Sequence, residues 1–207
     1  MFVYTVAFFA TLPLRVGIIW RNFQCWRFGK VARKQEDRIY ELSKHVLNSF
    51  ISEDKTINYI EYHSQLSLGY PTKENGERFS EICWEAPICF TIFHNDKPLV
   101  GMGLEFRGSA LCIWQLQGVR GAKVPETIRK WPALFVEGAK KFASETKEIR
   151  SVRVYAADQR ISYRFPEGDL SEADMCRHQR NLRRRYDGTA RQQGFKKVSK
   201  RYWEWKG

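Results

Sequence analysis

The sequence predicts an α+β fold in which a mixed, mostly antiparallel sheet is flanked by helices and carries an N-terminal helical extension. Two patterns indicate this fold. Residues 86–119 contain three apolar runs separated by short polar turns, as in an antiparallel meander. Residues 125–145 and 170–194 repeat apolar side chains at helical spacing, on either side of a strand-like run. The 207 residues are enough for one domain with an added segment.

Turn residues and apolar spacing define the elements of the C-terminal part. Turns at 94–98 and 107–109 divide the meander into three strands. Pro125 suits the first turn of the next helix, and the run SVRVYAA after that helix alternates as a strand does. Ser171 is then a predicted N-cap, and Gly194 a C-terminal stop, for one helix or a pair of helices. The segment KKVSKRYWEWK predicts a final strand.

Residues 1–85 are predicted to form an extension packed on a main domain of residues 86–207. Between residues 27 and 52, apolar side chains share one helical face and charged side chains the other. Residues 53–80 contain Gly, Pro and Asn turn signals and predict a connector with one or two short strands.

The opening of the chain has the composition of a membrane segment but not its pattern. Residues 1–20 are mostly apolar, yet Pro13 and Arg15 interrupt them before the roughly 18 uncharged residues that a span needs. We therefore expect an apolar arm on the domain and no membrane partner.

The cysteines indicate a reducing, cytoplasmic setting. Their number is odd, their spacing is irregular and no C-x-x-C occurs, which favours buried structural thiols over a disulfide framework or a zinc site. The five are Cys25, Cys83, Cys89, Cys112 and Cys176.

Two passages of residues 86–206 carry a resemblance to a known family. The ending ARQQGFKKVSKRYWEW places Gly194 where a helix stops and Phe195 where the chain enters the core. The passage QLQGVRGAKVP joins a strand to a helix through glycines. With the order of elements, these passages resemble the GNAT superfamily of acyl-CoA N-acyltransferases.

The resemblance implies a loop that holds the pyrophosphate of acetyl-CoA or another acyl-CoA. Backbone N–H groups near a helix N-terminus bind phosphate, and glycine lets the phosphate approach them. The loop is degenerate here, because Arg120 stands where the family usually has a small residue and Gly121 comes one place late. The predicted cofactor-binding residues are Gln115, Gly118, Arg120, Gly121, Ala122 and Lys123.

Two residues are candidates for acid–base chemistry. The family often places a tyrosine four residues before the Gly of Gly-Phe, and this chain has Ala190 there. Tyr186, one turn earlier, is the candidate acid, with a core position as the alternative. Glu105 is the candidate base, with an edge carboxylate facing water as the alternative.

The chain carries a net charge of +12, of which seven charges fall in residues 160–207. Five arginines in one predicted helix form a ridge suited to the phosphates of RNA or DNA, with a solvated basic face as the alternative. The ridge consists of Arg177, Arg180, Arg183, Arg184 and Arg185.

These features favour an acyl-CoA-dependent N-acyltransferase acting on an amine, with a nucleic-acid-associated or otherwise anionic substrate as one option. The alternative is a catalytically inactive GNAT-like module that binds nucleic acid or an acidic protein through its Arg-rich helix. A third option is an interaction protein that docks through residues 1–50. A V-shaped opening between two strands beside residues 115–126 would favour the enzyme.

Overall fold

The structure is a computed structural model that describes residues 36–57, 59–64, 86–119, 121–160, 163 and 170–207. The predictions made for residues 1–35 and 65–85 and for Arg120 lie outside these residues. The strands are β1 (Tyr59–Ser64), β2 (Ile88–His94), β3 (Lys97–Arg107), β4 (Ala110–Gly118), β5 (Ser151–Tyr155), β6 (Lys196–Lys197) and β7 (Tyr202–Lys206). The helices are α2 (Glu36–Glu53), η2 (Glu126–Ile128), α3 (Trp131–Glu145), η3 (Ala157–Gln159), α5 (Glu172–Arg183), the π-helical turn η4 (Arg184–Gly188) and α6 (Thr189–Gln192).

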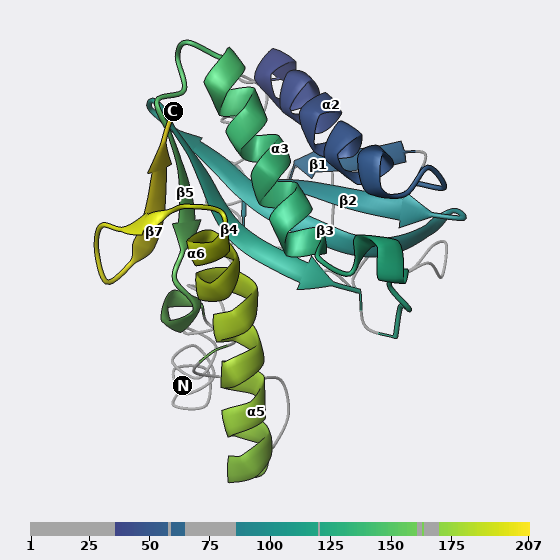
Figure 1. The fold of residues 1–207 in the computed structure, drawn as a ribbon, viewed down its shortest axis with the longest axis vertical. Coiled ribbons are helices and arrows are strands. Elements are labelled where there is room, and N and C mark those ends of the chain that lie inside the picture. The colour runs from purple at the N-terminus through teal and green to yellow at the C-terminus, as the bar shows by residue number, and fades with distance from the viewer. Residues whose placement is uncertain (1–35, 58, 65–85, 120, 161–162, 164–169) are drawn as a thin grey trace, which may run out of the picture.

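The described strands form one sheet in the order β1-β2-β3-β4-β5-β7-β6 (Figure 1). All neighbours are antiparallel except β4 and β5, which confirms the predicted α+β class with a mostly antiparallel sheet. The meander is confirmed as β2 to β4. Its first turn uses Asn95 and Asp96 at φ of 50° and 59°, a left-handed conformation that these two residue types tolerate.

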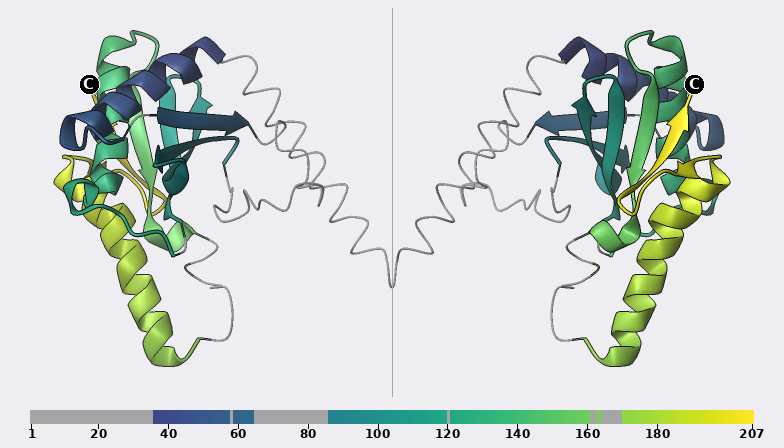
Figure 2. Two further views of the ribbon diagram at one scale, coloured as in Figure 1. Left: turned by 90° about the vertical axis from the view of Figure 1, so that its right-hand side faces the viewer. Right: turned by 90° about the vertical axis from the view of Figure 1, so that its left-hand side faces the viewer.

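Helices α2 and α3 lie side by side on one face of the sheet (Figure 2). The two helices contact each other through Phe50 of α2 and Phe135 of α3, whose rings pack edge to face with centroids 4.9 Å apart. Gly138 brings the two backbones close together, because a Cβ there would lie 2.6 Å from the Cα of Val46. The segment of α2 and β1, predicted as part of an extension, thus contributes to the main core and the main sheet.

The predicted helix over 125–145 begins later than expected. Pro125 precedes the short 3₁₀ helix η2, and α3 starts at Trp131. Pro132 explains the difference, since proline has no N–H and fits only the first turn of an α-helix.

The predicted limits of the last helical region are confirmed. The Ser171 hydroxyl accepts a hydrogen bond from the Asp174 N–H at 3.2 Å, and Gly194 has a φ of 80°. The single strand predicted after Gly194 is wrong, because β6 and β7 form a hairpin. The Ser199 hydroxyl accepts from the N–H of Arg201 at 3.1 Å and of Tyr202 at 3.3 Å, which stabilises the intervening turn.

Among the described helices, none is both long enough and apolar enough to cross a membrane.

Gly138→Ala should lower the free energy of unfolding by about 1–3 kcal/mol, because the added methyl group would push α3 away from α2. Urea unfolding measures this loss. Gly188→Ala is the matched control, since a Cβ at that position lies 3.7 Å from the Arg183 carbonyl oxygen, an ordinary contact. Equal stability of both variants would show that α2 and α3 are not packed this closely.

Asp54 should make stability depend on acid pH. Its carboxylate accepts hydrogen bonds from the hydroxyl groups of Thr127 and Thr56 and from the Thr56 N–H, and these lower its pKa from 3.8 to about 2. A lowered folded-state pKa stabilises the fold above pH 3.8, and this contribution is lost as the pH falls through about 2.

Asp54→Asn should therefore lose less stability than the wild type as the pH falls from about 5 to about 2. Urea unfolding across this range measures the difference. Parallel curves for the two proteins would contradict this role of the Thr127 contact.

Candidate functional site

Strands β4 and β5 diverge after a short parallel contact (Figure 1). Only Ala110 to Ile113 of β4 pair with β5, opposite Ser151 to Val154. Strand β4 continues to Gly118, and no described strand pairs with it on that side beyond Ile113. The second half of β4 therefore presents an open backbone edge next to α3 and η4.

A β-bulge marks the point of divergence. Gly103 of β3 pairs with Gln115 and Leu104 pairs with Ile113, so Trp114 has no partner in β3. An extra residue of this kind bends its strand and increases its twist. Gly103 allows the close approach, because a Cβ there would lie 2.8 Å from the Ala86 Cβ and 2.9 Å from the Gln115 Cβ.

Tyr186 reaches into the gap between the two strands. Its ring is buried, and its hydroxyl oxygen lies 2.8 Å from the Leu116 nitrogen and 3.3 Å from the Leu116 oxygen. The hydroxyl accepts from that N–H and donates to that C=O, so it takes the place of a neighbouring strand. Asp187 fixes the π-helical turn beside it by accepting from the Trp203 indole N–H at 2.8 Å.

Arg185 lies next to the same backbone group. Its Nη1 is 3.4 Å from the Leu116 oxygen, and its guanidinium lies 5.5 Å from the centre of the Trp131 ring. Burial lowers the pKa of this half-buried arginine. Within the described part of the chain no carboxylate lies within 4.0 Å of it, so its charge has no protein counter-ion there.

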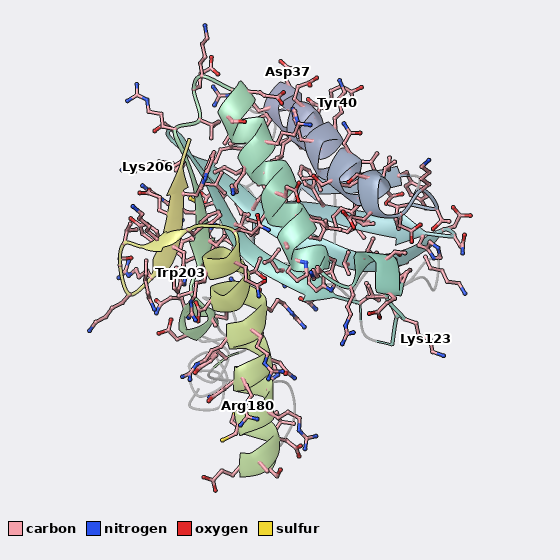
Figure 3. All side chains as sticks on the ribbon, viewed as in Figure 1. Asp37, Tyr40, Lys123, Arg180, Trp203 and Lys206 are labelled. Atoms are coloured by element: carbon pink, nitrogen blue, oxygen red, sulfur yellow. The ribbon has the colours of Figure 1, made fainter. Side chains whose placement is uncertain are left out.

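The predicted cofactor loop lies at the end of β4. A turn from Val119 to Ala122 is closed by the Ala122 N–H bonding to the Val119 oxygen at 3.2 Å, with Gly121 at a φ of 80°. Lys123 is exposed at the outer edge of this loop (Figure 3). Because η2 separates the loop from α3, its glycines do not directly precede an α-helix as the sequence predicted.

The two β4 residues of the predicted cofactor set have different surroundings. Gln115 is buried, and its side-chain amide donates to the Gln117 side-chain oxygen. Gly118 lies under the Trp131 indole, which a Cβ would approach to 3.9 Å.

Glu105 is buried rather than facing water. Its carboxylate accepts from the Arg107 Nε at 2.8 Å and from the Trp114 indole N–H at 3.1 Å. The neighbouring Phe106 packs against Phe142 of α3, so Glu105 lies on the opposite face of the sheet. Trp114 of β4 therefore binds Glu105, whereas Leu116, two positions further along the same strand, binds Tyr186.

The structure divides the predicted arginine ridge. Arg177, Arg180, Arg183 and Arg184 are exposed, whereas Arg185 belongs to the β4 edge. The helical spacing could not separate them, because the π-helical turn that begins at Arg184 changes the direction of the side chains that follow.

A layer of cations and aromatic rings on the outer sheet face was not predicted. Trp114 stacks on Tyr155 with centroids 4.0 Å apart, and Arg107 lies 4.8 Å from the Trp114 ring. Arg153 lies 4.8 Å from the Tyr202 ring. The alternation of polar and aromatic residues with apolar ones in β5 and β7 is the sequence pattern that could have indicated this layer. In the described residues, no group of three or more His, Cys, Asp or Glu side chains could hold a metal ion.

Tyr186→Phe should lower the free energy of unfolding by about 1–3 kcal/mol, because the Leu116 N–H would be left buried without a partner. Urea unfolding measures this change. Tyr40→Phe is the control, since Tyr40 is 53% exposed. A loss of equal size in both variants would contradict the role of the Tyr186 hydroxyl.

No protein-family model, no curated protein and no solved structure matches the chain. The divergence of β4 and β5 brings Arg185 and Tyr186 together at one strand edge.

Proposed function

We propose that the chain is an acyl-CoA-dependent N-acyltransferase, which moves an acyl group from a coenzyme A thioester to an amine. One observation carries the proposal: Arg185 holds a half-buried guanidinium, without a carboxylate among the described residues, beside the open edge of β4. The resemblance of residues 86–206 to the GNAT superfamily supports the same reading. The V-shaped divergence of β4 and β5 beside residues 115–126 supports it further.

The charge of Arg185 favours an anionic ligand at this edge. Burying an uncompensated charge costs free energy, and an anion that binds there recovers part of that cost. Guanidinium groups bind phosphate through paired, charge-assisted hydrogen bonds. Coenzyme A carries three phosphate groups and therefore suits this site.

The backbone of Leu116 suits the rest of such a ligand. An extended molecule with amide groups, such as the pantetheine arm of coenzyme A, bonds to an open strand edge much as a peptide strand does. The Tyr186 hydroxyl makes these hydrogen bonds in the structure. Ligand binding would therefore require this hydroxyl to release Leu116 or to share it.

The loop after β4 supplies further candidate phosphate contacts. Gly121 adopts its left-handed conformation without a side chain that would restrict access. The exposed ammonium group of Lys123 adds positive charge. Gly121, Lys123 and Arg120, the last of which lies outside the described residues, are the proposed phosphate contacts of this loop.

Two side chains are the proposed proton carriers. Bound acyl-CoA would supply the activated thioester. As the C–N bond forms and the C–S bond breaks, one proton leaves the amine and one reaches the departing sulfur. The Tyr186 hydroxyl inside the gap is the proposed donor, and Glu105, held by Trp114 at the bulge, is the proposed acceptor. The net charge of +12 favours an anionic acceptor substrate.

Calorimetric titration with acetyl-CoA and with free CoA tests the proposal. The wild type should bind both ligands, and Arg185→Gln should weaken binding about 10-fold to 150-fold, because a charge-assisted hydrogen bond to phosphate is lost. Arg184→Gln is the matched control, since Arg184 is the exposed neighbouring arginine. Circular dichroism checks that both variants fold.

Two results would contradict the proposal. One is the absence of binding by the wild type at about 1 mM ligand. The other is an equal loss of affinity in the Arg184 and Arg185 variants, which would show that only general positive charge attracts the ligand.

A further inference from the structure

Helix α5 extends beyond the sheet and away from α2 and α3 (Figures 1 and 2). Of its twelve residues, only Leu182 is buried. Helix α5 contacts the body at η3 and at Tyr163, whose carbonyl oxygen accepts from the Gln179 amide at 3.2 Å and whose ring lies 5.5 Å from the Arg183 guanidinium. Burial against the core therefore does not account for most of this helix.

Local interactions stabilise α5 instead. The Ser171 hydroxyl accepts from the Asp174 N–H and donates to the Asp174 carboxylate at 2.7 Å, which satisfies one N–H of the first turn and holds the carboxylate in place. Acidic residues occupy the first turn and arginines the last, an arrangement that complements the helix dipole. A polar helix stabilised in this way presents its surface to solvent rather than to the core.

The charge of α5 is concentrated on one ridge. Arg177, Arg180 and Arg184 are exposed and fall three and four positions apart, which places them on one face of the helix. Arg177 lies 3.6 Å from Asp174, and within the described residues no carboxylate lies within 4.0 Å of the other two. Figure 3 shows Arg180 on the part of α5 that extends from the body.

We infer that α5 binds the phosphate backbone of double-stranded DNA through this ridge, a surface separate from the proposed acyl-transfer site. From Arg177 to Arg184 the helix rises about 10 Å, so the three guanidinium groups form a row long enough to reach more than one phosphate of a strand. The width of an α-helix, about 10–12 Å, matches the B-DNA major groove of about 12 Å. The narrow major groove of A-form RNA does not admit such a helix.

The acidic residues near the tip of α5 do not oppose this docking. Asp174 is engaged by Ser171 and lies next to Arg177. Glu172 points about 140° away from Arg177 and about 80° away from Arg180, so it lies beside the ridge rather than on it. Arginines that contact phosphates position a protein on DNA without reading its sequence, so binding should depend little on sequence.

Fluorescence anisotropy with the full chain tests this inference. The probe is a labelled DNA duplex of about two helical turns, roughly 20 base pairs, titrated between about 50 and 200 mM NaCl. The logarithm of affinity should fall linearly with the logarithm of salt concentration. The triple variant Arg177→Gln, Arg180→Gln, Arg184→Gln should reduce this slope by about two to three units, because each phosphate contact contributes about 0.9.

A control variant loses the same charge elsewhere. Lys97→Gln, Lys141→Gln and Lys147→Gln change three exposed lysines on β3, α3 and the turn after α3. Its slope should change by less than about one unit. Duplex RNA and single-stranded DNA of the same length serve as competing ligands, and both should bind more weakly than duplex DNA.

Three outcomes would overturn the inference. They are equal slopes for the wild type and the ridge variant, tighter binding to RNA or single-stranded DNA than to duplex DNA, and no binding to duplex DNA at about 50 mM NaCl. The last outcome would leave the ridge as a solvated basic face or as a surface for an acidic protein. No coenzyme A is present in this assay, so its failure leaves the proposed acyl transfer unaffected.

Discussion

The hydrogen-bonding requirement of the β4 edge governs the arrangement around the gap. A strand that leaves its neighbour inside a folded protein has backbone groups that still need partners, because an unpaired buried N–H is costly. The bulge at Trp114 creates this situation by bending β4 after its last pair with β5. The Tyr186 hydroxyl resolves it at Leu116, whose N–H and C=O both keep a partner where the sheet opens.

The same requirement explains the irregular helix that carries Tyr186. A π-helical turn contains one more residue than an α-helical turn, and such turns are frequent at functional sites. Here the turn presents Arg185 and Tyr186 together toward β4, while Asp187 holds it against Trp203 of β7. Arg185 and Tyr186, which the sequence predicted as a nucleic-acid contact and a proton donor, therefore both bond to the carbonyl oxygen of Leu116.

Much of the fold could be predicted from local signals. The turns of the meander, the N-cap at Ser171 and the stop at Gly194 each depend on a few neighbouring residues, and the structure bears them out. The predicted start of α3 was wrong because Pro125 and Pro132 are both compatible with a first helical turn, and packing decides between them. The hairpin of β6 and β7 was missed because its turn contains no glycine or proline.

The candidate site was less predictable, because it depends on contacts distant in sequence. The helical spacing places Arg185 beside the row formed by Arg177, Arg180 and Arg184, but it gives no sign that Arg185 approaches Leu116, 69 positions away. Glu105 was found as an acid in the meander, but its engagement by Trp114 depends on the bulge. Residue type thus indicated candidates, whereas the long-range pairing determined their environment.

The position of β7 has a consequence for the order of folding. This strand follows β5 and β6 in the chain, yet it lies between them in the sheet. During synthesis on the ribosome, β5 therefore has an unpaired edge until residues 202–206 have emerged. Exposed strand edges pair readily with other chains, so during this interval the β5 edge is open to aggregation. Once β7 has added to β5, the edge of the sheet is β6, and its two lysines place charge there, which opposes pairing with other chains.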